Sequence, residues 1–262
     1  MAFQIPAELI QTIIDYNHND TQTLKTCATV SHFFLHHCRR HLFSDISLHS
    51  SKLSLNLYSL VLSSKPEIAL NVRELVIDGG PIRNRGNWPD NDEHLPKILS
   101  FVDRLQKLTL IQHFHPIVWD SLPKALLSAL IERIQSPSLT ILHLRGWVGL
   151  PKSLVMNLNQ LRELSIDPSH LIDDSNHLSS ALGLEGLEIL ELQYINLVAA
   201  PTTPLDIFLY MERLLLLHIE AFDTYTLSFA QQVIHRYAGS LRSILLDGWW
   251  DDSEVWSPSS SS

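Results

Sequence analysis

The chain has 262 residues, 45% of them apolar and 18% charged, which is the composition of a folded protein and not of a disordered one. Its net charge of −9 at pH 7 argues against general nucleic-acid binding, which needs a basic surface. We expect no membrane span, because no apolar run reaches about 18 residues, and no signal peptide at residues 1–6. Two cysteines, Cys27 and Cys38, are too few for a disulfide framework, so we expect a reducing compartment, the cytoplasm or the nucleus.

Residues 5–43 have the pattern of three short helices separated by polar breaks. Pro6 suits the first turn of the first helix, and Asp20 suits the cap of the second. The third is expected from Ser31 to Leu42. The apolar residues at helical spacing are Leu9, Ile10, Ile13 and Ile14 in one stripe, then Leu24, Cys27, Ala28, Phe34, Leu35, Cys38 and Leu42. Helices this short are marginal alone, so we expect a partner or the following domain to stabilise them.

This region resembles the F-box in the form common in fungal F-box proteins. The stretches that carry the resemblance are Ile5-Pro6-x-Glu8-Leu9, Cys27 to Phe34, and Arg40-His41-Leu42-Phe43. The family pattern has Leu where this chain has Ile5, and it commonly has Trp where Phe34 stands. The resemblance implies binding to the small Skp adaptor, which links F-box proteins to a cullin-based ubiquitin ligase. The adaptor contacts that it implies are Ile5, Pro6, Leu9, Ile13, Val30 and Phe34.

Seven six-residue frames of the form apolar–x–x–apolar–x–apolar follow along the chain. They are Val72–Ile77, Leu105–Leu110, Leu139–Leu144, Leu161–Ile166, Leu187–Leu192, Leu214–Ile219 and Leu241–Leu246, and a poorly formed first frame is expected at Phe43–Leu48. The seven starts are 33, 34, 22, 26, 27 and 27 residues apart, a spacing typical of stacked repeats. If each frame is a strand, its second and third apolar residues point into the core.

Helical segments are predicted between several frames. One carries Leu53, Leu57, Leu60 and Val61 and ends before Pro66, the second spans Ser121–Gln135, and the third carries Leu227, Ala230, Val233, Ile234 and Tyr237 and stops near Gly239. The order of strand, helical return and strand repeats every 22–34 residues. This repetition predicts an α/β fold with a parallel sheet and right-handed crossovers. A stack of such repeated units is a solenoid.

The frames resemble leucine-rich repeats, which often follow an F-box. Those repeats usually place Asn three residues after the last leucine of the frame, whereas here the position holds Gly80, His113, Trp147, Ser169, Ile195, Phe222 and Trp249. We therefore expect an irregular solenoid with variable helical returns. The predicted organisation is an F-box-like helical domain at 1–48, a leucine-rich-repeat-like solenoid at 49–250, and a disordered acidic, serine-rich tail at 251–262.

Frame positions three, five and seven are expected to point outward, onto the concave face of the solenoid. Position three holds Glu74, Lys107, Ile141, Glu163, Ile189, Leu216 and Ser243; position five holds Val76, Thr109, His143, Ser165, Glu191, His218 and Leu245; position seven holds Asp78, Ile111, Arg145, Asp167, Gln193, Glu220 and Asp247. This mixture of polar, charged and apolar residues is typical of a protein-binding surface. The mainly acidic column at frame position seven favours a partner with basic elements. The alternative is a solvated face without a ligand. The residues that we assign to target binding are His143, Arg145, Glu191, Gln193, His218 and Glu220.

Two further groups of residues have more than one interpretation. Aromatic residues just past the frames are expected to pack beneath their own repeats, with a role as binding anchors as the alternative; they are Trp147, Tyr194, Phe222, Trp249 and Trp250. The third predicted helix carries His32/His36 and His37/His41 at a spacing where two imidazoles can share a metal. Each pair offers only two ligands, and the pairs lie on different faces, so we predict no metal and no cofactor.

These observations together predict the substrate-recognition subunit of a Skp–cullin–F-box ubiquitin ligase. The F-box would bind the Skp adaptor, and through it a cullin, while the repeats would bind a target protein. The first alternative is an interaction scaffold outside any ligase. An enzyme is not expected, because the chain has no G-x-S-x-G, P-loop or H-E-x-x-H motif. An enzyme would instead require His143, His218 and an acidic neighbour in contact in a cleft.

Overall fold

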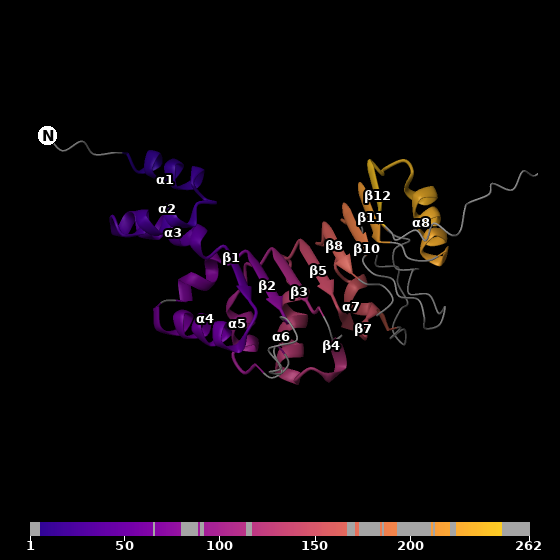
Figure 1. The fold of residues 1–262 in the computed structure, drawn as a ribbon, viewed down its shortest axis with the longest axis horizontal. Helices are drawn as coiled ribbons and strands as arrows, with labels where there is room; N and C mark the ends of the chain where they lie inside the picture. The colour runs from indigo at the N-terminus through magenta and orange to yellow at the C-terminus, as the bar shows by residue number, and fades with distance from the viewer. Residues whose placement is uncertain are drawn as a thin grey trace, which may run out of the picture.

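The structure, a computed structural model, describes residues 6–64, 66–79, 89, 92–113, 117–166, 171–172, 184, 186–192, 211, 213–220 and 224–247. A large sheet of eight parallel strands organises this part of the chain, with the order β1-β2-β3-β5-β8-β10-β11-β12 (Figure 1). Each strand of this sheet therefore lies beside the next one along the sequence. The predicted α/β class with a parallel sheet is confirmed.

Each predicted frame carries one strand, which begins at frame position three. The strands are β1 Asp45–Leu48, β2 Glu74–Asp78, β3 Lys107–Ile111, β5 Ile141–Arg145, β8 Glu163–Ile166, β10 Ile189–Leu192, β11 Leu216–Glu220 and β12 Ser243–Asp247. Neighbouring strands pair in frame register: Glu74 lies opposite Lys107, and Lys107 opposite Ile141. The weak frame at residues 43–48 is also a strand, because Asp45 of β1 pairs with Glu74 of β2. The sheet thus begins within the segment assigned to the helical domain.

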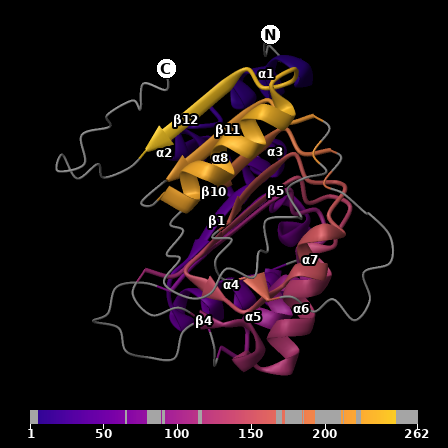
Figure 2. The same cartoon turned by 90° about the vertical axis from the view of Figure 1, so that its right-hand side faces the viewer.

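Helices pack along one face of the sheet. Figure 1 shows α4 (Ser51–Ser64), α5 (Leu95–Phe101), α6 (Lys124–Ile134) and α7 (Lys152–Met156) on the same side, and Figure 2 shows α8 (Thr224–Tyr237) beside β10 and β11. The predicted helices at α4, α6 and α8 are confirmed. Two shorter 3₁₀ segments, η1 (Pro66–Asn71) and η2 (Trp119–Ser121), complete the returns. No helix in the described ranges is both long enough and apolar enough to cross a membrane.

Two details of the returns differ from the predictions. The helix predicted over Ser121–Gln135 begins only at Lys124, because Pro123 has an extended ψ of 135° and is the N-cap. The short helices α5 and α7 were not predicted, since seven and five residues contain too few turns for a periodic pattern. Two small sheets, β4 (Ile117–Val118) with β6 (Trp147–Val148) and β7 (Leu150–Pro151) with β9 (Leu171–Ile172), edge the same side.

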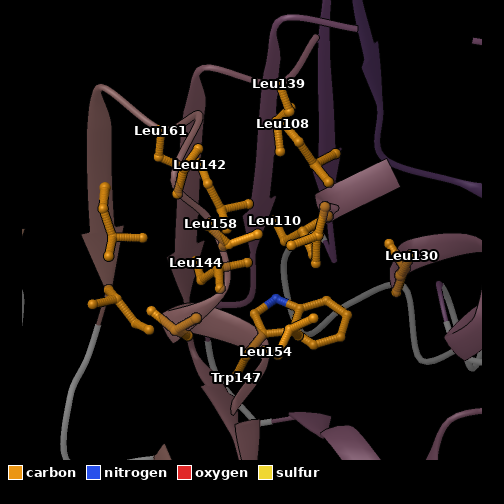
Figure 3. Packing of buried hydrophobic residues seen from close by; sticks show 14 of the residues in the cluster. Leu108, Leu110, Leu130, Leu139, Leu142, Leu144, Trp147, Leu154, Leu158 and Leu161 are labelled. Carbon is orange, nitrogen blue, oxygen red and sulfur yellow. The ribbon is translucent and has the colours of Figure 1, made fainter. Parts of the chain in front are cut away.

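The core lies between the sheet and these helices (Figure 3). Leu108, Leu142 and Leu164, at the fourth position of successive frames, are completely buried. Each such leucine stabilises the fold by about 1.5–3 kcal/mol relative to an exposed side chain. Trp147 is also buried and meets Trp119 edge-on, with ring centroids 6.1 Å apart. Packing beneath the repeat is therefore confirmed for Trp147, whereas Tyr194, Phe222, Trp249 and Trp250 lie outside the described residues.

A helical head, formed by α1 (Ala7–Tyr16), α2 (Thr21–Ala28) and α3 (His32–Leu42), precedes the sheet (Figure 1). It has a small core of its own, built around Ile14, Leu24 and Cys38 and separate from the large core. The three helices predicted from the sequence are confirmed. Because the head buries so few side chains, little of its apolar content is used for its own folding.

Candidate functional site

The head presents apolar side chains to solvent. Leu9 and Ile13 of α1 are 55% and 51% exposed, and Val30, which follows α2, is 64% exposed. Pro6 is exposed as well, at the start of α1. We call Leu9, Ile13, Tyr16, Val30 and Phe33 the head surface, because all five are large apolar or aromatic residues with exposed side chains. Exposed apolar clusters of this kind are typical of docking sites.

The head surface arises because α1 is apolar on two sides. Ile14 is buried in the head core and Ile10 packs against it, but Leu9 and Ile13 point away from it. The stripe predicted from Leu9, Ile10, Ile13 and Ile14 is therefore divided between the head core and the solvent. The small head core, to which α2 and α3 contribute Leu24 and Cys38, covers only one edge of the wide apolar stripe of α1.

Two aromatic residues of the head surface were missed by the sequence analysis. Tyr16 is seven residues after Leu9 and three after Ile13, which is the spacing of one helical face and would have found it. Phe33 follows the N-cap Ser31 and is partly exposed. Phe34, in contrast, packs against the head core, and Ile5 lies outside the described residues.

Helix caps hold the head in this arrangement. The Asp20 carboxylate accepts hydrogen bonds from the backbone N–H groups of Gln22 and Thr23, at 3.1 and 3.0 Å, and from the Thr23 hydroxyl at 2.6 Å. These bonds to Thr23, aided by the Gln22 amide, lower the pKa of Asp20. Ser31 similarly accepts a bond from the Phe34 N–H at 3.4 Å. Both caps were visible as residue types in the sequence.

A second candidate surface is the open face of the sheet, formed by positions three, five and seven of the frames. The alternation predicted for these positions is confirmed in β2, where Leu75 and Ile77 are buried and Glu74, Val76 and Asp78 are half-buried. Arg145 at the end of β5 is exposed. Gln193 and the side chain of Glu220 lie outside the described residues.

Imidazoles and carboxylates from five consecutive strands meet on this open face. His143 Nε2 of β5 lies 2.7 Å from Glu163 Oε1 of β8. His218 of β11 lies between two carboxylates: its Nδ1 is 3.0 Å from Glu191 Oε1 of β10, and its Nε2 is 2.9 Å from Asp247 Oδ2 of β12. We call these five residues the carboxylate–imidazole row. Glu163 and Asp247 were not selected from the sequence, although each occupies an outward frame position beside a selected histidine.

Both ring nitrogens of His218 lie within hydrogen-bond distance of a carboxylate. An ionised carboxylate only accepts hydrogen bonds, and a neutral imidazole carries one N–H donor, so it can satisfy one carboxylate. An imidazolium carries two donors and satisfies both Glu191 and Asp247.

Other charged residues on the open face are also paired. Lys107 Nζ lies 3.6 Å from Glu74 Oε2, and His113 Nε2 lies 3.3 Å from Asp78 Oδ1. Both pairs join neighbouring strands or their ends and are partly exposed, so each stabilises the fold by less than about 1 kcal/mol. The open face remains acidic in spite of these pairs, because carboxylates outnumber lysine and arginine among its described residues.

Two residues at position five are buried although they lie on the open face. Ser165 and Thr109 are 3% and 7% exposed. The hydroxyl of Thr109 has no hydrogen-bond partner within the part of the chain that the structure describes. At these two strands a side chain expected to point outward is therefore not exposed to solvent.

The two histidines that would mark an enzyme do not come together. His143 on β5 and His218 on β11 are separated by three strand spacings, or about 14 Å, and each contacts its own carboxylates. On α3, His41 contacts Asp15, and His36 and His37 meet edge-on at 5.5 Å. The described residues contain no group of three or more side chains arranged to hold a metal.

No protein-family model matches this chain, and a search of curated proteins finds no match either.

Proposed function

We propose that this protein is the substrate-recognition subunit of a Skp–cullin–F-box ubiquitin ligase. In this proposal the helical head is an F-box that docks the Skp adaptor, and the open face binds a target protein. The observation that carries it is the exposed head surface, with Leu9, Ile13 and Val30 more than half exposed on a head that has its own small core.

The energetics of the head support a docking role. Covering the exposed halves of Leu9, Ile13 and Val30 stabilises a complex by roughly 1 kcal/mol each before the entropic costs of association are subtracted. Tyr16 is 87% exposed and is the type of residue that often dominates binding at an interface. A partner would have to span α1, the end of α2 and the start of α3 to bury all five residues.

The sheet supports the second half of the proposal. Successive strands pair in the same frame register from β1 to β12, so equivalent positions form continuous columns across the open face. We propose that this arrangement is an irregular leucine-rich-repeat solenoid, with the head at one end. Its columns give a target an extended surface, as in other repeat proteins.

The mechanism in this proposal is proximity and requires no chemical step in this chain. The adaptor would tether the head to a cullin while the open face holds the target, so the effective concentration of target near the ligase rises. The sites of adaptor and target binding lie on different elements, which allows both partners to bind together.

Co-purification with the Skp adaptor tests the proposal. Ile13→Asp and Val30→Asp place a charge in the proposed interface and should each abolish recovery of the adaptor. Leu62→Asp is the matched control, because Leu62 on α4 is 59% exposed but lies outside the head. Binding of the adaptor by the Leu62 variant, with loss in the two head variants, is the expected pattern.

The alternative outcomes separate the two non-enzymatic functions. If the intact chain does not bind the adaptor, the ligase proposal is lost. If affinity purification followed by mass spectrometry recovers a target but neither adaptor nor cullin, the chain is a scaffold outside the ligase. If it recovers all three, the proposal holds and the target is identified in the same experiment.

A further inference from the structure

We infer that β12, the last strand of the large sheet, pairs with the β12 of a second copy of this chain. The two strands run antiparallel about a two-fold axis in this dimer, and they join the sheets of the two copies into one. The inference does not depend on the proposed function. It names an interaction surface of the protein and the partner that this surface fits.

The outer edge of β12 is free. β12 pairs in parallel with β11, and no other strand of the described ranges pairs with it. The backbone N–H of Ser243 donates to the Leu215 carbonyl of the preceding frame. Because alternate residues of a parallel strand bond to one neighbour, the backbone groups of Ile244 and Leu246 point to the free edge. These two residues offer two donors and two acceptors to an added strand.

The side chains of β12 are also uncovered. All five residues of the strand are exposed, and Ile244 and Leu246, at frame positions four and six, are 41% and 42% exposed. The equivalent residues of the neighbouring strand β11, Leu217 and Ile219, are completely buried. The core side of β12 therefore resembles the inside of a repeat from which the next unit has been removed.

β12 lacks the features that keep an edge strand from pairing with another chain. Such strands are commonly very short, carry Lys or Pro, or contain a bulge. β12 has three consecutive aliphatic residues, no Lys or Pro, and an unbroken register with β11. The strand at the other edge, β1, differs, because Leu48 is buried there and Ile46 packs against the large core. β12 is therefore the edge of the sheet that is suited to accept a strand.

The sequence of β12 is complementary to itself when one copy is reversed. With Leu245 opposite Leu245 of the second copy, Ile244 lies opposite Leu246, and Ser243 lies opposite Asp247. Aliphatic residues then meet aliphatic residues, and a hydroxyl meets a carboxylate to which it can donate. No two carboxylates lie opposite each other. A second copy thus matches the apolar centre and the polar ends of the strand without any other component.

The same register satisfies the backbone. In an antiparallel pair, residues that exchange both hydrogen bonds alternate with residues that exchange none. Ile244 and Leu246 direct their backbone groups to the free edge, so each pairs with the other in the second copy and exchanges bonds. Leu245 then forms the pair without bonds at the axis, where opposite Cα atoms are only about 4.5 Å apart. Its side chain, 48% exposed in the single chain, is covered by its equivalent.

The position of β12 leaves the rest of the molecule accessible. Figure 1 shows the helical head and β12 at opposite ends of the large sheet. Figure 2 shows α8 beside β10 and β11, and the residues of β12 remain exposed in its presence. The dimer therefore carries its two heads at its far ends, where neither head covers the other.

Sedimentation velocity of the full chain tests the inference. The unaltered chain, of 29.8 kDa, should double its mass between about 1 and about 100 µM, as is expected of a small interface. Leu245→Lys places two like charges opposite each other at the axis and should weaken the dimer at least about tenfold. Leu62→Lys is the matched control, because Leu62 is an aliphatic residue of α4 that is 59% exposed. It should dimerise as the unaltered chain does.

A charge-exchange experiment tests the register. Leu245→Glu should be as monomeric as Leu245→Lys, but an equimolar mixture of the two variants should dimerise, because a lysine then faces a glutamate at the axis. Ile13→Asp alters the head surface, the other exposed apolar cluster, and should leave the dimer unchanged. Thermal unfolding of each variant shows that the fold is kept.

Each result supports or overturns the inference. A monomer at every concentration would overturn it, whether the edge stays free or is taken by another segment of the chain or by another protein. Equal losses in Leu245→Lys and Leu62→Lys would also overturn it, because the dimer would then use another surface. A mixture of the two Leu245 variants that stays monomeric would exclude the two-fold register. The adaptor experiment is independent, since the head lies at the other end of the sheet.

Discussion

His41 Nε2 lies 2.6 Å from Oδ1 of Asp15, and this contact fastens α3 to α1 within the helical head. The two residues are 26 positions apart in the sequence. Since α1 carries Leu9 and Ile13, the contact also helps to fix the orientation of the proposed adaptor surface.

A double-mutant cycle measures the energy of this contact. Asp15→Asn, His41→Gln and the combined variant should give a coupling free energy of roughly 0.5–1 kcal/mol, because the pair is only partly buried. Chemical denaturation of the full chain, followed by hydrogen exchange of the α1 amides, provides the measurement. Additive effects of the two substitutions would show that the contact does not stabilise the head.

Gly146 lies in a turn that should not tolerate a side chain. Its φ of 71° is in the left-handed region, and a Cβ there would lie 2.2 Å from the backbone oxygen of Gln112. Gly146→Ala should lower the free energy of unfolding by about 2 kcal/mol or more. Gly239→Ala is the control, because a Cβ at Gly239 meets nothing within 4 Å, and its midpoint of unfolding should stay nearly unchanged.

The unsatisfied hydroxyl of Thr109 should cost stability. Thr109→Val replaces it with a methyl group of similar shape and should raise the free energy of unfolding by about 1 kcal/mol. Thr140→Val is the opposite case, because Thr140 Oγ1 donates to the Gln106 carbonyl at 3.3 Å, and it should lower stability by a similar amount. Urea unfolding distinguishes the two signs, and destabilisation by Thr109→Val would contradict the prediction.

The two cysteines should react at different rates. Burial, with a smaller contribution from nearby Cys27, raises the pKa of the Cys38 thiol, so less of the reactive thiolate is present. Cys27 is only half-buried and should be alkylated first by iodoacetamide, with the order read by peptide mass spectrometry. In Cys27→Ser the native chain should react only after unfolding. Rapid labelling of Cys38 in that variant would show that the head opens easily.

The cap at Asp20 should make α2 sensitive to acid. Its hydrogen bonds with Thr23 lower the pKa in the folded state below the ordinary value of 3.8. The carboxylate therefore stabilises α2 above that value, and the stabilisation is lost as the pH falls through the lowered folded-state pKa.

Hydrogen exchange of the Gln22 and Thr23 amides measures this effect. Asp20→Ala removes the acceptor of both amides, so their exchange should be fast at neutral pH. Their remaining protection should then not fall further when the pH is lowered. Asp20→Asn is the control, because asparagine retains the accepting oxygen without the titration, so protection should persist. Equal protection in the alanine variant would show that the cap does not hold the helix.

Local periodicity made much of the fold predictable. The alternation within Leu187–Leu192 placed Leu190 in the core, and the frames of β2, β3, β5, β8 and β11 behaved alike because a strand turns successive side chains to opposite faces. The prediction was wrong for the last frame, where Ile244 and Leu246 of β12 are 41% and 42% exposed. The same reasoning located α4, α6 and α8. It failed for α5 and α7, which are too short to repeat a pattern.

The sequence by itself determined the strands of the large sheet, the longer helices and most of the strand positions that face outward, since these depend on neighbours a few residues apart. Only the tertiary structure decided that His218 lies between Glu191 and Asp247, which are 27 and 29 positions away from it. It also decided that Leu9 and Ile13 are uncovered while Ile14 is buried. Such contacts depend on the register of strands and the docking of helices, which are set by packing across the whole chain and not by any local pattern.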